Sequence, residues 1–192
     1  MRIIRALEPR DNTAIAEIII SVLAEHGFTN PTNGGYDRNN LPEKIRDLYS
    51  FIRKNNGSYY VIEDTETNKI LGGGGYIISP GPVSAHYSAN VLFFNHHQRT
   101  ICSLEKFYLL PEARGTGLAE EVFKRLQKSA FLKGLNAMYV STEPCLNRAI
   151  SFYKKMGFME IEPHKKNTVR LVHRQHRAAE PVPEEKSVGW VV

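Results

Sequence analysis

The stretch that decides the fold of this chain is LLPEARGTGLAEEVFKRL, residues 109–126. A run of apolar residues stops at Pro111, and the segment RGTG, residues 114–117, opens a stretch whose apolar residues recur every four positions. That period is typical of a helix with one buried face. The stretch therefore predicts a strand, a short glycine-rich loop and a helix, in that order.

A junction of this kind can bind an anion. Glycine adopts positive φ at little cost and lets the backbone come close to a ligand. The first amides of a helix have no partner within the helix, and the helix dipole makes that end positive, so phosphate is a suitable ligand. Arg114 adds a positive charge. An ordinary loop with glycine turns has the same sequence, so both interpretations stay open on these residues alone.

A second glycine run, Gly72 to Gly75, is not a phosphate loop. The β-forming residues Tyr76 to Ile78 follow it, whereas a dinucleotide-binding fingerprint needs a helix at that point. Neither glycine run is followed by Lys-Ser or Lys-Thr, so the chain has no P-loop at these sites. The run favours a strand that is bulged or closely packed against its neighbours.

The rest of the chain alternates between the two kinds of periodicity. Strands are expected at 2–6, 58–64, 69–79, 101–110, 137–142, 158–161 and 168–172. Helices are expected at 15–27, from Asn40 onward with Glu43 completing a capping box, at 115–133 and at 146–156. This order predicts a mixed α/β (α+β) fold with a mainly antiparallel central sheet flanked by helices.

The length of 192 residues predicts one domain, which we place at 1–174, with a polar C-terminal tail at 175–192. Hydrophobic residues make up 42% and charged residues 23%, which excludes disordered, collagen-like and disulfide-framework classes. The net charge of +5 permits an anionic ligand. Because the basic residues are scattered and form no recognition motif, we expect no nucleic-acid partner.

Neither a membrane nor a metal is expected as a partner. The N-terminus lacks an apolar signal core, and no apolar stretch approaches the ~20 residues that a membrane-spanning helix needs. Cys102 and Cys145 fit no metal or redox spacing, so we interpret them as free thiols in the cytoplasm. The histidines show no paired ligand spacing on a helix, so no metal site is assigned.

A second block, CLNRAISFYKKMGF at 145–158, changes the interpretation of the first. Taken alone, Tyr153 would be a core aromatic residue and Gly157 a helix stop. Taken together and at this spacing, the two blocks resemble the GNAT N-acetyltransferase superfamily. The matching residues are Leu109, Pro111, Arg114, Gly115, Gly117, Ala119, Ala149, Tyr153, Gly157 and Phe158. The family's loop signature, Gln/Arg-x-x-Gly-x-Gly/Ala, is Arg114, Gly117 and Ala119 here.

The resemblance implies that residues 1–174 are a single acetyltransferase domain that binds acetyl-CoA. The pantetheine arm would lie where the strand before the loop separates from the next parallel strand, and would pair with the backbones of Phe107 and Leu109. Asn147 is a further candidate contact, although the family's usual asparagine position is occupied by Leu146. The pyrophosphate would be held by the loop amides of Arg114, Gly115, Thr116, Gly117, Leu118 and Ala119.

The resemblance also implies direct transfer of the acetyl group to a primary amine of a small molecule or an amino-acid-like acceptor. Tyr153 would donate a proton to the sulfur, and the Leu109 N–H would contact the carbonyl oxygen. Glu105 is the candidate base, and a solvated or salt-bridged Glu105 is the equal alternative. Strand alternation predicts that Glu105 points to the same side as Ser103 and Phe107.

Residues 27–40 and the irregular loop at 80–100 are the segments expected to contribute to acceptor recognition, with Tyr36 and Asp37 as the candidate residues. Asp37 would equally serve to cap its own loop. The alternative to an enzyme is a non-catalytic module that binds or senses acyl-CoA without turnover. A homodimer is common in the family, so the resemblance admits one here.

Overall fold

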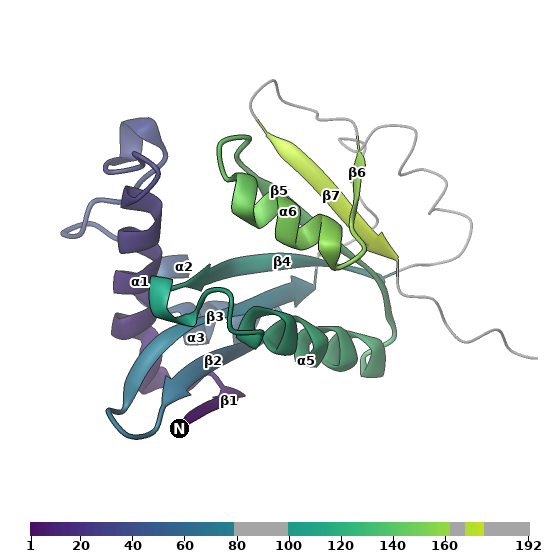
Figure 1. The fold of residues 1–192 in the computed structure, drawn as a ribbon, viewed down its shortest axis with the longest axis horizontal. Helices are drawn as coiled ribbons and strands as arrows, with labels where there is room; N and C mark the ends of the chain where they lie inside the picture. Colours follow the sequence, from purple (N-terminus) through teal and green to yellow (C-terminus); the bar gives the residue numbers. More distant parts are fainter. Residues whose placement is uncertain (79–99, 162–167, 175–192) are drawn as a thin grey trace, which may run out of the picture.

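The computed structural model describes residues 1–78, 100–161 and 168–174 (Figure 1). The proposed tail at 175–192 and almost all of the expected loop at 80–100 lie outside these ranges. No helix among the described residues is both long and apolar enough to cross a membrane.

The centre of the fold is a seven-stranded sheet in the order β1-β2-β3-β4-β5-β7-β6. Its strands are β1 (Arg2–Ala6), β2 (Ser58–Asp64), β3 (Lys69–Ile78), β4 (Thr100–Leu109), β5 (Leu135–Thr142), β6 (Met159–Ile161) and β7 (Val169–Arg174). Only β4 and β5 run parallel, and every other neighbouring pair is antiparallel. The predicted mixed α/β fold with a mainly antiparallel sheet is confirmed.

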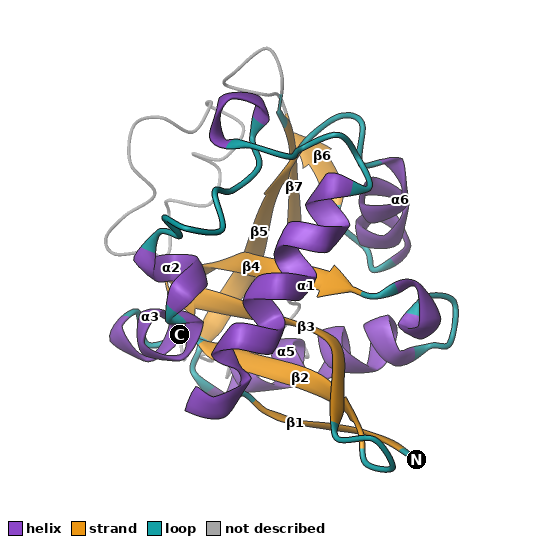
Figure 2. Cartoon of the chain, turned by 90° about the vertical axis from the view of Figure 1, so that its left-hand side faces the viewer, coloured by secondary structure: helices purple, strands orange, loops and turns teal. Residues whose placement is uncertain are grey.

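Helices cover both faces of this sheet. On one face lie α1 (Asn12–Ala24), α2 (Glu43–Arg46) and α3 (Leu48–Lys54), and on the other lie α5 (Leu118–Leu132) and α6 (Asn147–Lys155). Figure 2 shows α1 crossing in front of the sheet and α5 behind it. Single turns of 3-10 helix occur at Pro9–Asp11, Pro31–Asn33 and Pro111–Ala113.

The helix expected from Asn40 onward is instead two short helices, so its predicted start and capping box are wrong. Pro42 precedes α2, which begins at Glu43 without a side-chain cap. Asp47 then breaks the helix with φ −129° and ψ 67°, and its carboxylate caps α3 by accepting the Ser50 N–H at 3.1 Å. Capping preferences for aspartate override the continuous apolar face that suggested one helix.

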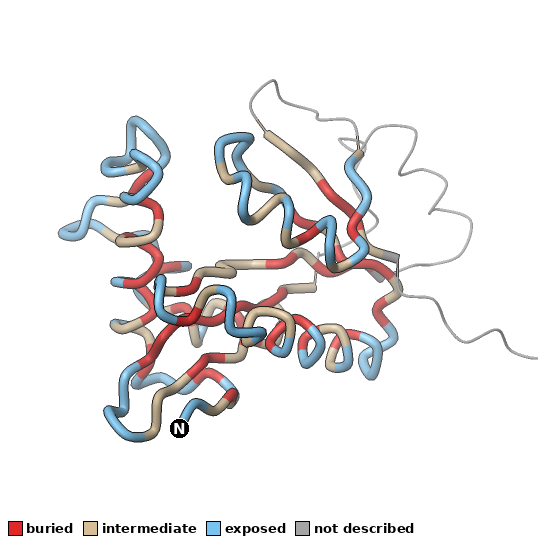
Figure 3. The backbone as a smooth tube through the Cα atoms, viewed as in Figure 1, coloured by how far each residue is buried: buried red, intermediate tan, exposed pale blue. Residues whose placement is uncertain are grey.

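A hydrophobic core lies on each face of the sheet, and buried residues are most continuous along β3, at the middle of the sheet (Figure 3). The run Gly72 to Gly75 is the closely packed strand that the sequence favoured. A Cβ on Gly74 would lie 2.2 Å from the Phe107 ring, and one on Gly73 would lie 2.4 Å from the Tyr60 carbonyl oxygen. The glycines therefore bring β3 close to its neighbours rather than binding a ligand.

Candidate active site

The strands β4 and β5 pair over only part of their length. Thr100 to Ser103 lie opposite Leu135 to Tyr139, and beyond this point β4 continues to Leu109 without β5 beside it. A cavity of about 360 Å³ occupies the opening, which is within the range of small-ligand sites. Its lining includes Ser103, Glu105, Lys106, Phe107, Leu109, Thr142 and Tyr153. The opening expected between these strands is therefore present.

A β-bulge at Lys106 reshapes β4 at this opening. Gly73 and Gly75 lie opposite Tyr108 and Glu105, so β4 has one residue more than β3 over this step. Lys106 takes φ +50°, and its carbonyl oxygen accepts the Tyr59 hydroxyl at 2.8 Å. An extra residue of this kind shifts the alternation of side chains along the strand.

The shift corrects one prediction. Ser103 and Glu105 lie on the same side, as expected, but Phe107 packs into the core beneath α5 and α6, 5.4 Å from the Phe152 ring. Strand alternation placed Glu105 and Phe107 together, and the bulge between them separates the two side chains. Tyr108 lies in the core on the α1 side instead.

Glu105 is both salt-bridged and turned to the cavity. Its Oε1 accepts a hydrogen bond from the Ser103 hydroxyl at 3.3 Å, and its Oε2 lies 3.4 Å from the Lys106 Nζ. The side chains of Glu105 and Lys106 are only 20% and 14% exposed. The salt-bridged alternative for Glu105 is thus present, and its carboxylate remains part of the cavity wall.

Tyr153 presents a buried phenol to the same cavity. Its ring packs between Phe152 and Phe158, with centroid distances of 5.6 and 5.5 Å. Burial raises the pKa of Tyr153 well above its ordinary value, and the nearby Tyr108 and Glu105 raise it further. No residue of the described ranges hydrogen-bonds its hydroxyl. Tyr153 is therefore a protonated acid whose proton is available to a ligand.

The loop at 114–117 has the backbone that an anion site requires. Gly115 and Gly117 take φ +72° and +85°, and Gly117 is the N-cap of α5. A Cβ on either glycine would meet no atom within 4 Å, so the space beside both is open. The Thr116 hydroxyl closes the turn onto the Ala113 carbonyl at 2.8 Å. Leu118 and Ala119 begin the helix, where amides lack partners within it.

The Arg114 side chain differs from the simple charge that the sequence suggested. Its guanidinium donates to both carboxylate oxygens of Glu25, at 2.7 and 2.9 Å, and its Nε donates to the Leu109 carbonyl at 2.8 Å. The hydrogen bond from Arg114 lowers the pKa of Glu25. Arg114 thus ties the loop to the end of α1, and its charge is neutralised by Glu25.

Three other predicted residues have simpler positions. Asn147 is exposed at the start of α6 and does not line the cavity. Asp37 caps its own loop by accepting the Asn39 N–H at 2.9 Å. Tyr36 is half-buried near Glu105; burial raises its pKa, Lys44 opposes that rise, and the charge of Glu105 adds to it.

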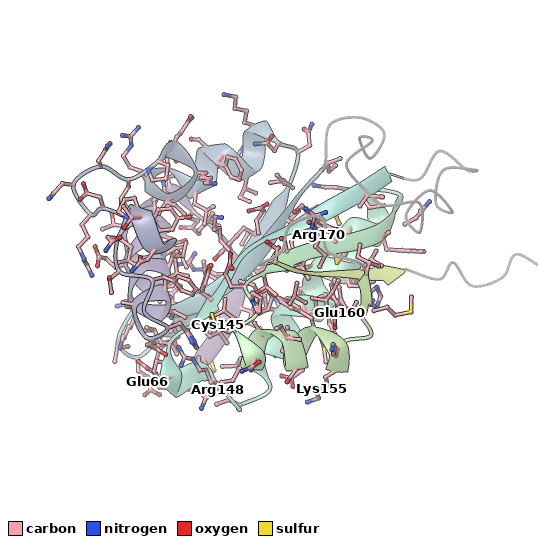
Figure 4. The ribbon with its side chains drawn as sticks, turned by 90° about the horizontal axis from the view of Figure 1, so that it is seen from above. Glu66, Cys145, Arg148, Lys155, Glu160 and Arg170 are labelled. Atoms are coloured by element: carbon pink, nitrogen blue, oxygen red, sulfur yellow. The ribbon has the colours of Figure 1, made fainter. Side chains whose placement is uncertain are left out.

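Sequence reasoning missed two cations of the site. Lys106 enters the cavity because of the bulge, which has no sequence signal. Arg148 lines the cavity from the first turn of α6 and makes no ion pair with any described residue (Figure 4). The sequence does contain a signal for Arg148, because it is a basic residue at the start of a predicted helix that follows a predicted strand. No group of three or more potential metal ligands occurs in the part of the chain that the structure describes.

The sequence profile of the Acetyltransferase (GNAT) family matches residues 24–158. The chain belongs to the GNAT acetyltransferase family. It is 31% identical over 160 residues, 83% of each chain, to YjgM, an uncharacterized N-acetyltransferase of Escherichia coli K12. The GNAT assignment inferred from the two sequence blocks is confirmed, and the protein is an acyltransferase.

Solved structures agree with this GNAT fold. A GNAT-family acetyltransferase from Staphylococcus aureus Mu50 superposes with a TM-score of 0.69 at 15% identity, over 91% of this chain and 99% of that one. An acetyltransferase from Streptococcus agalactiae 2603 gives a TM-score of 0.67 at 14% identity, over 91% and 98%. GNAT acetyltransferases as a family use acetyl-CoA as co-substrate.

Proposed function

We propose that this GNAT protein transfers the acetyl group of acetyl-CoA directly to a primary amine of a small molecule or an amino-acid-like acceptor. The observation that carries the proposal is the cavity between β4 and β5, because one ligand-sized space is lined by the Tyr153 phenol and the Glu105 carboxylate. Both cysteines are free thiols, which fits our assignment of the reaction to the reducing cytoplasm.

The residues present fit acetyl-CoA. The open space beside Gly115 and Gly117 and the first amides of α5, at Leu118 and Ala119, suit a pyrophosphate. The edge of β4 that β5 leaves free would pair with the pantetheine arm through the backbones of Phe107 and Leu109. Arg148, a cation at the cavity wall, is available to a further anionic group.

Acetyl-CoA supplies a thioester whose carbonyl carbon accepts the amine. Glu105 takes one proton from the acceptor's ammonium, which leaves a neutral nucleophile. One N–C bond then forms and one C–S bond breaks, while the Leu109 N–H stabilises charge on the carbonyl oxygen. Tyr153 gives its proton to the departing sulfur and receives the second nitrogen proton in return. The released proton finally leaves Glu105 for water.

The direct test is to incubate the purified protein with radiolabelled acetyl-CoA and a panel of primary amines and amino acids. N-acetylated forms of the same compounds are the matched controls, because they lack the nucleophile. We expect label in the amide product of at least one amine and none in the controls. Tight binding of acetyl-CoA with no transfer across the panel would instead identify an acyl-CoA sensor and overturn the proposal.

A further inference from the structure

Lys106 occupies a backbone position that disfavours its own side chain. Its φ of +50° belongs to the left-handed region, which costs any residue with a Cβ and suits glycine or asparagine better. Residues held in such conformations cluster at functional sites. Lys106 is part of the cavity lining, and its side chain is only 14% exposed, with its Nζ beside the Glu105 carboxylate.

Lys106 and Glu105 form a fixed pair of opposite charges on the cavity wall. Their charged atoms lie 3.4 Å apart, and the Ser103 hydroxyl holds the other oxygen of the carboxylate at 3.3 Å. Glu105 is the one ion-pair partner of Lys106 among the described residues. Arg114, the neighbouring cation of the lining, is already neutralised by Glu25. Arg148 also lines the cavity, but Lys106 is the cation that lies within ion-pair distance of Glu105, so it is the one that an acceptor bound at Glu105 would contact.

This pair sets a condition on the acceptor. A simple amine approaches as a cation and would be attracted by Glu105 but repelled by Lys106 at nearly the same distance. An α-amino acid carries its ammonium and its carboxylate on one carbon, so its two charges are neighbours in the same way. Because the side chains of Glu105 and Lys106 are mostly buried, complementary charges would interact with them more strongly than with fully exposed side chains.

We propose that Lys106 binds the carboxylate of the acceptor and that the acceptor is an α-amino acid or a close analogue, with its amine at Glu105. This inference rests on the proposed acetyl transfer and adds a specificity-determining residue to it. The acceptor's carboxylate would take over the place of Glu105 as the partner of Lys106 while Glu105 receives the amine.

The first experiment compares pairs of acceptors that differ only in the carboxylate. Such pairs are L-phenylalanine with 2-phenylethylamine, L-leucine with 3-methylbutylamine and L-alanine with ethylamine, extended to the remaining amino acids and their decarboxylated amines. We expect kcat/KM to be at least tenfold higher for the amino acid of the pair that the enzyme accepts. Transfer without this preference would overturn the inference and leave acetyl transfer intact, whereas no transfer to any member would overturn both.

The second experiment tests the residue. Lys106→Met keeps the length of the side chain and removes its charge, and Lys128→Met on the exposed face of α5 is the matched control. We expect Lys106→Met to raise KM for the amino acid at least tenfold, while KM for the decarboxylated amine falls or stays the same and KM for acetyl-CoA changes less than twofold. Lys106→Arg should restore most of the preference. An equal loss with both acceptors would show a structural role and overturn the inference; if the variants do not fold, the wild-type comparison decides.

Discussion

The two halves of β4 use the same strand in opposite ways. The half from Thr100 to Ser103 is paired with β5, and Cys102 and Ser103 are also paired with β3. Cys102 is fully buried, and burial raises its pKa to about 12. From Lys106 to Leu109 no β5 residue is paired with the strand, and these residues contribute to the lining of a cavity. Burial keeps the Cys102 thiol of the first half inert, whereas Tyr153 and Glu105, beside the second half, line a cavity large enough for a small ligand.

The difference arises where β4 and β5 separate while each stays paired with another strand on its outer edge. β4 stays paired with β3 as far as Leu109 opposite Gly72, and β5 stays paired with β7 as far as Thr142 opposite Val169. Each strand therefore keeps a partner on its outer edge where the two separate. Separation of two strands that are each secured elsewhere opens a site in a sheet without exposing its core.

We expect the largest effect from Tyr153, the proposed acid beside the open half of β4, Lys106 to Leu109. Tyr153→Phe keeps the packing against Phe152 and Phe158, so KM for acetyl-CoA should stay within about twofold, while kcat falls by ~10²–10⁴ because the proton donor is lost. Since burial raises the pKa of Tyr153 above 10.0, the phenol keeps its proton across the usual assay range. The pH profile of the wild type should therefore show no loss from this group below pH 10.

The control for this change is Tyr60→Phe on β2, a half-buried tyrosine outside the cavity lining. We expect its kcat to match the wild type in steady-state assays. Equal losses in the two variants, or a rise of KM for acetyl-CoA that parallels the fall in kcat, would make Tyr153 a structural residue.

We expect a smaller effect from Glu105, the carboxylate beside the open half of β4. Glu105→Gln keeps the shape and can still accept the Ser103 hydrogen bond, but it cannot take the acceptor's proton, so kcat/KM for the amine should fall by ~10² near neutral pH. The rate should recover at higher pH as water deprotonates the amine. Glu121→Gln, exposed on α5, is the control. A Glu105→Gln variant as fast as the wild type at pH 7 would show that Glu105 is not the base and serves only as the ion-pair partner of Lys106.

The glycine loop permits a matched comparison at the two ends of α5. Gly117 and Gly134 take similar positive φ, +85° and +72°, and a Cβ on either meets no atom within 4 Å. Alanine at each should cost about 1 kcal/mol of stability through backbone strain. Only Gly117→Ala should weaken acetyl-CoA binding, by about tenfold, in calorimetric titration. Equal affinities for the two variants would argue against phosphate binding at this loop.

We expect the smallest effect from the ion pair between Arg114 in the glycine loop and Glu25 at the end of α1. Glu25→Gln removes one charge from a partly exposed ion pair with Arg114, and such pairs contribute ~1 kcal/mol or less. KM for acetyl-CoA should rise by less than about fivefold, because the backbone amides that face the phosphates stay in place. A larger loss in steady-state assays would show that the Arg114 tie determines the shape of the loop.

The features that the sequence predicted are local ones. The strand, loop and helix at 109–126 follow from glycines that allow positive φ and from helix amides without partners, and both are properties of neighbouring residues. The expectation that Tyr153 belongs to the same site as β4 followed from the resemblance, since spacing along one chain does not give distance in space.

The features that the sequence could not predict depend on distant contacts. The Lys106 bulge appears only when β4 is aligned with β3, and it separates Phe107 from Glu105. The pair of Arg114 with Glu25 joins residues 89 positions apart. The break at Asp47 is local, but two competing tendencies, an apolar helix face and an aspartate cap, left its outcome undecided in the sequence.

The central claim is that the open half of β4 is where acetyl-CoA binds and reacts. A crystal structure of the protein with CoA tests it most directly. The account predicts the pyrophosphate against the amides of Gly117 to Ala119 and the sulfur about 3–4 Å from the Tyr153 hydroxyl. CoA bound elsewhere, or bound here with its sulfur far from Tyr153, would contradict it.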